Sequence, residues 1–304
     1  MKDLNGKVGV VTGGAGGIGK AIGVAMLAEG MKVVLADVLD GPLQDAVQEI
    51  GSDDLIGVAS DVTSYESMCA LRDAAVEKFG AVHVICNNAG IGSGAKGNMW
   101  EHHLNDWRWS IDVNVLGVVN GINAFVPMLV EQDEGHVVNT SSGNGGFTPM
   151  VNSAIYPVTK AAVTTISECL WGQLKQVESN VSVSILYPSS KTPGVLATGI
   201  WNAGANRPDR YSRGEDETEP SGRDALAEYI ARAKEAGQEV QIAPLSEVAD
   251  LCINGIKNDN FWATYPSERQ ATQLNARVES QINQTPPDYL LGVNLMARAP
   301  AKQS

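Results

Sequence analysis

The chain has 304 residues, of which 43% are hydrophobic and 19% are charged, and its formal net charge is −13. The length allows one large domain or two modest ones, and the composition excludes a disordered polyelectrolyte and a fibrous repeat. An acidic chain repels phosphate backbones and anionic lipids, so we expect no nucleic-acid partner and no membrane partner.

Short β-branched runs alternate with longer helical patterns from the N-terminus to Pro188. The runs predict strands at 8–11, 32–36, 55–58, 82–86, 136–139 and 181–186. The helical patterns predict helices at 18–28, 42–50, 64–79, 107–130 and 153–178. The strands are apolar along their whole length, which is typical of parallel strands buried on both faces. The alternation therefore predicts a doubly wound α/β sheet.

The pattern changes after Pro188. We expect no strand from Ser189 to about Pro244, where charges of both signs are frequent. Further along, the spacing predicts a helix at 225–236, a last sheet unit at 246–256 and 261–265, and a surface helix at 268–282 before a loose tail. The substrate-determining part of the chain is expected in this region, because it departs from the regular alternation.

The cysteines and histidines argue against cross-links and metal sites. Cys69, Cys86, Cys169 and Cys252 stand far apart with no C-x-x-C spacing, which favours reduced thiols. The histidines stand alone or as direct neighbours, so we expect no metal. The N-terminus lacks an apolar signal segment, and no stretch reaches the roughly 18 apolar residues of a spanning helix. We therefore expect a soluble cytoplasmic protein.

A glycine-rich run, TGGAGGIGK at residues 12–20, separates the first strand from the first helix. It satisfies the general dinucleotide pattern from Gly14 to Gly19 and a longer pattern from Thr12 to Gly19. It also satisfies the G-x-x-x-x-G-K of nucleotide-triphosphate loops, but Ala21 stands where that motif needs a hydroxyl for magnesium. A dinucleotide is therefore favoured, because glycines let the backbone approach a pyrophosphate at a helix N-terminus.

Asp37 ends the second predicted strand, 18 residues after Gly19. A carboxylate at this place accepts hydrogen bonds from the ribose hydroxyls and repels a 2′-phosphate. The loop offers no Arg or Lys before Lys20 to offset that repulsion. The sequence therefore predicts NAD(H) in preference to NADP(H).

Five more motifs follow in a fixed order, and together they resemble the short-chain dehydrogenase/reductase family. The motifs are Asp61-Val62, Asn87-Asn88-Ala89-Gly90, Asn114, Ser141-Ser142, and Tyr156 to Lys160 as Y-x-x-x-K. The resemblance covers about residues 5–190 and 245–265. It implies a three-layer Rossmann-type fold in one domain over 1–304, with a substrate lid inserted at 189–244 and a C-terminal extension at 266–304.

The Y-x-x-x-K motif places Tyr156 and Lys160 on one face of a helix. The ammonium favours a tyrosinate, so we expect it to lower the pKa of Tyr156 from about 10 towards the working pH. Tyr156 is then a general base for alcohol oxidation and a general acid for ketone reduction. The resemblance implies that Lys160 also binds the nicotinamide ribose, that Ser142 holds the substrate oxygen and that Asn114 anchors a water-linked proton path.

The resemblance also implies a set of cofactor contacts. The residues expected to bind the cofactor are Gly13, Gly16, Gly17, Ile18, Gly19, Asp37, Val38, Asp61, Val62, Asn88, Ala89, Gly90, Tyr156, Lys160, Pro188 and Thr192. The chain departs from the family in three places. The loop between Ser142 and Tyr156 is one residue longer than is commonest, Ser189 replaces the usual glycine after Pro188, and Thr192 comes one residue early.

The substrate side is expected at 93–99, 143–151 and 193–201, which are mainly apolar. Such a pocket suits a bulky secondary alcohol or ketone. The residues expected to contact the substrate are Met99, Phe147, Met150, Val195 and Trp201.

A basic group in the lid has two interpretations. Arg207, Arg210 and Arg213 could meet an acidic substrate, but their acidic neighbours Asp209 and 215–217 favour a solvated, self-paired lid.

A narrower resemblance concerns short stretches at 146–150, 154–156 and 206–210. These are similar to bacterial short-chain dehydrogenases that oxidise the benzylic alcohol of lignin-type aryl ethers. Two alternatives to an alcohol dehydrogenase stay open: a non-catalytic dinucleotide-binding scaffold, and a dehydratase or double-bond reductase on the same fold. The family implies a homo-oligomer, a tetramer or dimer formed through the helices at 107–130 and 153–178.

Overall fold

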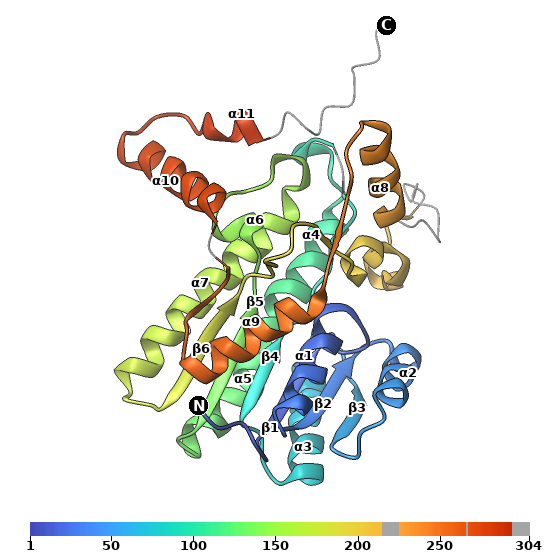
Figure 1. Ribbon diagram of the computed structural model, residues 1–304, viewed down its shortest axis with the longest axis vertical. Helices are drawn as coiled ribbons and strands as arrows, with labels where there is room; N and C mark the ends of the chain where they lie inside the picture. The colour runs from blue at the N-terminus through green and yellow to red at the C-terminus, as the bar shows by residue number, and fades with distance from the viewer. Residues whose placement is uncertain (96, 215–224, 266, 294–304) are drawn as a thin grey trace, which may run out of the picture.

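The computed structural model describes residues 1–95, 97–214, 225–265 and 267–293, and a seven-stranded sheet forms its centre (Figure 1). Its strands are β1 (Val8–Thr12), β2 (Lys32–Asp37), β3 (Leu55–Ala59), β4 (Val84–Asn87), β5 (Gly135–Thr140), β6 (Val181–Leu186) and β9 (Trp262–Ala263). Their order is β3-β2-β1-β4-β5-β6-β9, and neighbouring strands are parallel. The predicted doubly wound sheet is confirmed.

Helices cover both faces of the sheet (Figure 1). Successive strand residues point to opposite faces, so Val11 packs in one core cluster and Val10 in another. The cluster around Val11 includes side chains of α1 (Gly17–Ala28), α2 (Asp40–Ile50) and α9 (Leu245–Asn258). The cluster around Val10 includes side chains of α3 (Tyr65–Phe79), α5 (Gly117–Glu131) and α7 (Ile155–Gln176). The chain therefore forms three layers.

The prediction of one continuous helix at 107–130 is wrong. The chain forms α4 (Leu104–Ile111), then a π-helical turn, η2 (Asp112–Leu116), and only then α5. Such turns are frequent at functional sites, and this one contains the fully buried Asn114.

The combined span Leu104–Glu131 is long and apolar enough, by length and composition alone, to cross a membrane. Its hydropathy reflects packing in the core, since Phe125 and Leu129 of α5 are fully buried there.

The segment after β6 contains two short strands that the sequence pattern does not predict. β7 (Val195–Leu196) and β8 (Ile242–Ala243) pair in parallel, apart from the main sheet. Strands of two residues are too short to show an alternating pattern. Between them lie the 3₁₀ segments η4 (Gly199–Asn206) and η5 (Asp209–Tyr211), and α8 (Ala225–Glu235).

The C-terminal part agrees with the predicted surface helix. α10 (Glu268–Ile282) has no buried residue, and α11 (Tyr289–Val293) follows it near the top of the view in Figure 1. The remainder of the expected tail, 294–304, lies outside the described residues.

Candidate active site

The carboxyl ends of the central strands bring the sequence motifs to one edge of the sheet. The glycine loop follows β1, residues 88–90 follow β4, Ser142 follows β5 and Pro188 follows β6. The strand order reverses between β1 and β4. Doubly wound sheets bind ligands in the crevice at such a switch point.

The glycine loop forms an open backbone cradle. Gly13 and Gly17 have positive φ angles of 69° and 56°, which glycine adopts without steric cost. A Cβ on Gly19 would overlap the Gly13 carbonyl oxygen, whereas a Cβ on Gly16 would meet no protein atom within 4 Å. Ile18 stands in the first turn of α1. Free N–H groups at this helix start, with space in front of them, fit the pyrophosphate of a dinucleotide.

Asp37 lies at the end of β2 against the glycine loop. Its carboxylate accepts the N–H of Ala15 and the N–H of Leu39, each at 3.1 Å. These bonds orient the carboxylate, and each oxygen retains a lone pair for another donor. Val38, the next residue, is exposed. The arrangement fits a ribose whose hydroxyls donate to Asp37.

Thr12 joins the glycine loop to the turn after β4. Its hydroxyl accepts the N–H of Asn88 and the N–H of Ala89, each at 3.0 Å. The Asn88 amide donates to the Thr12 carbonyl at 2.9 Å. Since one side chain bonds both segments, the walls of the switch-point crevice are held at a fixed spacing.

Lys160 is buried beside Tyr156. Only 3% of Lys160 is exposed, its Nζ donates to the Thr140 carbonyl at 2.8 Å, and burial lowers its pKa to about 8. The Nζ atom lies 5.7 Å from the centroid of the Tyr156 ring. A Cβ on Gly90 would lie 3.3 Å from Nζ, so glycine gives the ammonium room. Among the described residues, no carboxylate forms an ion pair with Lys160.

The expectation of a lowered Tyr156 pKa is wrong. Burial raises the pKa of Tyr156, and a hydrogen bond with Ser142 offsets only part of that increase. Burial favours the neutral form of the Tyr156 phenol, and it also favours the neutral form of the Lys160 amine. Burial therefore opposes the tyrosinate that the Y-x-x-x-K spacing favours.

The two serines after β5 have different surroundings. Ser141 donates to the Lys160 carbonyl at 2.7 Å and bonds the Thr164 hydroxyl at 2.9 Å, so it fixes α7 to the sheet. Ser142 is hydrogen-bonded to Tyr156. It also precedes the short α6 (Gly143–Gly146), where its hydroxyl accepts the Asn144 N–H at 3.1 Å. Ser142 is thus the serine available to a substrate.

Asn114 bonds the loop after β4 to α7. Its amide oxygen accepts the Ile91 N–H at 2.8 Å, and its amide nitrogen donates to the Ile91 carbonyl and to the Thr159 hydroxyl. The π-turn directs this side chain inward. Asn114 therefore fixes the position of the loop that begins at Gly90, next to Lys160.

The orientation of Thr192 is fixed by a residue that no sequence motif indicates. Glu247 of α9 accepts the Thr192 hydroxyl at 2.7 Å and also bonds Ser190 and the N–H of Lys191. The hydrogen bonds from Ser190 and Thr192 lower the pKa of Glu247 to about 2. The loop after Pro188 is thereby fixed to α9.

Among the described residues, the lid arginines pair with carboxylates outside the lid and not with Asp209. Arg207 and Arg213 both donate to Asp106 of α4, at 2.7 and 2.9 Å, and Arg210 donates to Asp61 at 3.0 Å. The physical reason is that Asp106 is buried and needs cationic partners, which no sequence spacing reveals. The other acidic neighbours, at 215–217, lie outside the described residues, so the part of the prediction that concerns them stays a prediction.

The predicted substrate residues lie in different surroundings. Met99 is exposed at the start of η1 (Met99–Glu101), and Met150 lies at the surface. Phe147 packs against Tyr187 with the ring centroids 4.9 Å apart, and the Trp201 indole donates to the Leu196 carbonyl. Val195 pairs with Ile242 between β7 and β8.

The C-terminal extension contacts the loop that follows Ser142. Arg277 of α10 donates to the carbonyls of Gly145 and Phe147, at 3.3 and 3.4 Å. No motif marks this contact, because both acceptors are backbone atoms. The helix predicted as a surface element therefore supports a wall of the site.

A sequence profile of the short chain dehydrogenase family matches residues 7–203. An uncharacterised oxidoreductase of Staphylococcus aureus strain MW2 is 35% identical over 210 residues, which are 69% of this chain and 86% of that protein. The profile ends before the second half of the insert, so these matches describe the dinucleotide-binding part and the Y-x-x-x-K helix.

Two solved structures extend the similarity to most of the chain. A short-chain dehydrogenase/reductase from Burkholderia phymatum in complex with NAD is 35% identical, with a TM-score of 0.80 over 94% of this chain and 98% of that chain. The apo form of LigO from Sphingobium sp. strain SYK-6 is 26% identical, with a TM-score of 0.69 and full coverage of both chains. The similarity therefore extends beyond the part of the chain that the family profile matches.

Proposed function

Because the chain belongs to the short-chain dehydrogenase family, we propose that it is an NAD(H)-dependent oxidoreductase that interconverts a bulky secondary alcohol and its ketone. The observation that carries the proposal is the grouping of Ser142, Tyr156 and Lys160 beside an open glycine cradle. A scaffold protein needs the cradle but has no need of a buried lysine next to a tyrosine.

NAD(H) is the cofactor that the cradle fits. Asp37, oriented by two backbone N–H groups, offers a carboxylate to ribose hydroxyls and opposes a 2′-phosphate. The Burkholderia phymatum relative was solved with NAD. When bound, NAD supplies the acceptor for a hydride from an alcohol, and NADH supplies the donor in the reverse direction.

In the oxidation, the Ser142 hydroxyl holds the substrate oxygen, and Tyr156 takes the hydroxyl proton from the substrate alcohol. In the reduction, the neutral Tyr156 gives its phenolic proton to the forming alkoxide. The raised pKa of Tyr156 keeps the phenol protonated for the second role, although it also makes the phenol a weaker acid. For oxidation, a positive charge must favour the tyrosinate, and Lys160 at 5.7 Å from the ring is the cation of this chain placed to do so.

The apolar side chains on the segments near Ser142 support a bulky substrate, with an aromatic or alicyclic secondary alcohol as the expected class. Phe147, Met150, Val195 and Trp201 stand on the segments that flank Ser142 and the loop after β6. We include benzylic alcohols of aryl ethers in this class because of the short similarities at 146–150 and 206–210.

The test is a panel of aryl and steroidal secondary alcohols assayed for NADH formation, together with direct titration of NADH and NADPH. We expect turnover with at least one bulky alcohol and tighter binding of NADH than of NADPH. Tight NADH binding without turnover of any alcohol or ketone would favour the scaffold alternative. Absence of NADH binding would contradict the proposal altogether.

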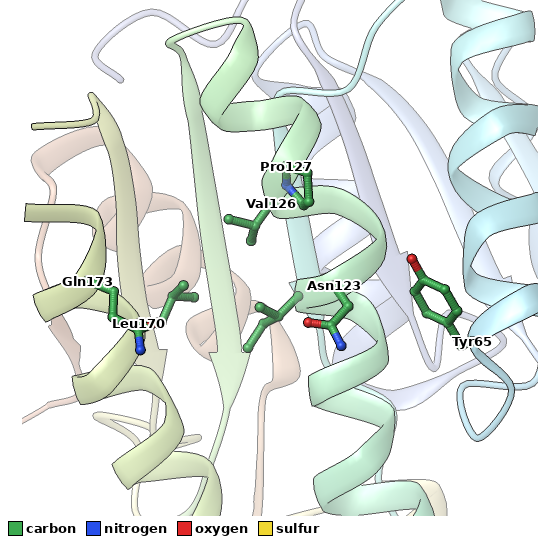
Figure 2. Close-up of a pocket in the computed structure, with 7 residues that line it drawn as sticks. Tyr65, Asn123, Val126, Pro127, Leu170 and Gln173 are labelled. Carbon is green, nitrogen blue, oxygen red and sulfur yellow. The ribbon is translucent and has the colours of Figure 1, made fainter. Parts of the chain in front are cut away.

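We also propose that the chain forms a homo-oligomer through α5 and α7. A surface groove lies along these helices, lined by Tyr65, Ile122, Asn123, Val126, Pro127, Leu170 and Gln173 (Figure 2). The exposed Cys169 lies in the continuation of this groove. The two helices present this apolar strip to solvent in the monomer, and a second copy is the occupant that would bury it.

Light scattering on the purified protein tests this assembly. We expect a dimer or tetramer for the wild type and a monomer for Cys169→Glu, which places a charge in the groove. Val177→Glu, at the exposed end of α7, is the matched control and should assemble normally. A monomeric wild type would refute the assembly.

We propose a cytoplasmic location as well, supported by four free cysteines.

A further inference from the structure

Thr159 lies where three parts of the candidate active site meet. It precedes Lys160 on α7 and is fully buried. Its hydroxyl donates to the Tyr156 carbonyl at 2.8 Å and accepts a hydrogen from the Asn114 amide nitrogen at 3.0 Å. A threonine hydroxyl has a single hydrogen to donate. Because that hydrogen is used on Tyr156, Asn114 must be the donor in the second bond.

The direction of this bond determines which way the Asn114 amide faces. The amide nitrogen gives its two hydrogens to Thr159 and to the Ile91 carbonyl, the second at 2.9 Å. The amide oxygen accepts the Ile91 N–H at 2.8 Å. With the amide turned over, its oxygen would face the Ile91 carbonyl and its nitrogen the Ile91 N–H, so both bonds to Ile91 would be lost. All three bonds therefore favour one orientation.

The restraint on Asn114 extends to the surroundings of the lysine. A Cβ on Gly90, the residue before Ile91, would lie 3.3 Å from Lys160 Nζ and 3.4 Å from Asn114 Oδ1. The loop that begins at Gly90 therefore meets the ammonium and Asn114 at the same point. Since the Asn114 side chain is bonded to α7 on one side and to this loop on the other, it holds the two at a fixed separation.

Loss of the Thr159 hydroxyl would leave a buried donor without its acceptor. Within the described part of the chain, the Asn114 amide nitrogen donates to Thr159 and Ile91 alone, and Asn114 is fully buried. A buried N–H without an acceptor is costly, because bulk water does not replace the lost bond. Other bonds fix α7 to the sheet, among them that from Ser141 to the Lys160 carbonyl. They keep the helix in place but accept no hydrogen from Asn114, so the effect of the loss falls on Asn114 and the loop.

We propose that Thr159 is a positioning residue of the active site: its hydroxyl holds Asn114 in one orientation between Tyr156 and the loop that begins at Gly90. Thr159 acts through Asn114 and takes no part in proton or hydride transfer. The kinetic part of the test rests on the proposed function, since it needs a turnover to measure. The exchange part does not, because the bond between Asn114 and Ile91 forms in the protein alone.

Hydrogen exchange at the Ile91 amide in the cofactor-free protein tests the restraint, because Asn114 is the acceptor of that N–H. Thr159→Val keeps the shape of the side chain without the hydroxyl, and Thr159→Ser keeps the hydroxyl. Thr272→Val is the matched control, since the Thr272 hydroxyl donates to the Glu268 carbonyl within α10 at 2.8 Å. We expect exchange to be about tenfold faster in Thr159→Val and within about threefold of the wild type in the other two variants.

Steady-state kinetics with the best alcohol substrate test the consequence for the active site. We expect kcat to fall about tenfold in Thr159→Val and to recover to within about threefold of the wild type in Thr159→Ser. Thr272→Val should have the wild-type kcat. If Thr159→Val does not fold, Thr159→Cys takes its place, because a thiol forms only weak hydrogen bonds.

Three results would overturn the proposal. The first is wild-type exchange at Ile91 in Thr159→Val, which would show that the hydroxyl does not hold Asn114. The second is an equal defect in Thr159→Ser, which would assign the effect to the shape of the side chain. The third is faster exchange with an unchanged kcat, which would separate Thr159 from the active site. If the wild type converts no alcohol or ketone, the proposed function fails, while the exchange comparison still decides whether Thr159 holds Asn114.

Discussion

Replacing Lys160 with methionine should leave the cofactor-free protein as stable as the wild type at pH 7, or more stable, although it removes a residue of the active site. Lys160 is 3% exposed, and within the described part of the chain its Nζ atom donates only to the Thr140 carbonyl. Burial lowers its pKa from 10.5 to about 8. At about 1.4 kcal/mol for each pH unit, this difference corresponds to about 3 kcal/mol of destabilisation by the charged form below pH 8.

Methionine has a similar length and no charge, so it removes this cost. The Thr140 carbonyl loses its donor, which costs about 1–3 kcal/mol and offsets much of the gain. The pH dependence is the clearer quantity. The unfolded chain binds the lysine proton more tightly than the folded protein, so wild-type stability gains about 3 kcal/mol as the pH rises from 8 to 10.5.

Urea unfolding of both proteins at a series of pH values between 7 and 10.5 measures this difference directly. All other titrating groups are common to the two proteins and cancel in the comparison. We expect the stability advantage of Lys160→Met at pH 7 to fall by about 3 kcal/mol by pH 10.5. A constant difference between the proteins across this range would refute the argument from burial.

Three further variants test other parts of the structure. Burial lowers the pKa of His136 from 6.5 to about 4, so the wild type should lose about 3 kcal/mol of stability as the pH falls from 6.5 to 4. Acid unfolding of His136→Gln should lack this loss. If the variant and the wild type have the same acid profile, the argument from the burial of His136 is contradicted. In Gly90→Ala the added Cβ lies 3.3 Å from Lys160 Nζ, and we expect kcat to fall about tenfold or more in steady-state assays, whereas wild-type kcat would show that the ammonium is free to move. In Asp37→Ala the preference for NADH over NADPH in binding titrations should weaken by about 10-fold or more, and unchanged discrimination would mean that Asp37 does not read the ribose.

Much of the fold follows from local patterns in the sequence. The apolar runs and helical spacings predict the six strands from β1 to β6 and the sheet that they form, because buried parallel strands need apolar side chains on both faces. The glycine loop is also predicted from the sequence, because Gly13 and Gly17 have positive φ angles that other residues rarely adopt.

The parts that escaped prediction depend on contacts between distant segments. The buried Asp106 determines where Arg207 and Arg213 go, and no spacing in the sequence links these three residues. The π-turn at Asn114 interrupts a run that is apolar enough for a continuous helix. The pKa of Tyr156 has the opposite direction to the prediction, because the Y-x-x-x-K spacing carries the charge of Lys160 but not the burial of both residues.

The most direct test of the proposed chemistry compares wild type and Tyr156→Phe with the best alcohol substrate, measuring NADH formation and NADH binding on the same samples. The proposal predicts that the variant loses about 10²–10⁴-fold in kcat while its Kd for NADH stays within about threefold of the wild type. Equal turnover by Tyr156→Phe would contradict the role of Tyr156 as the acid and base.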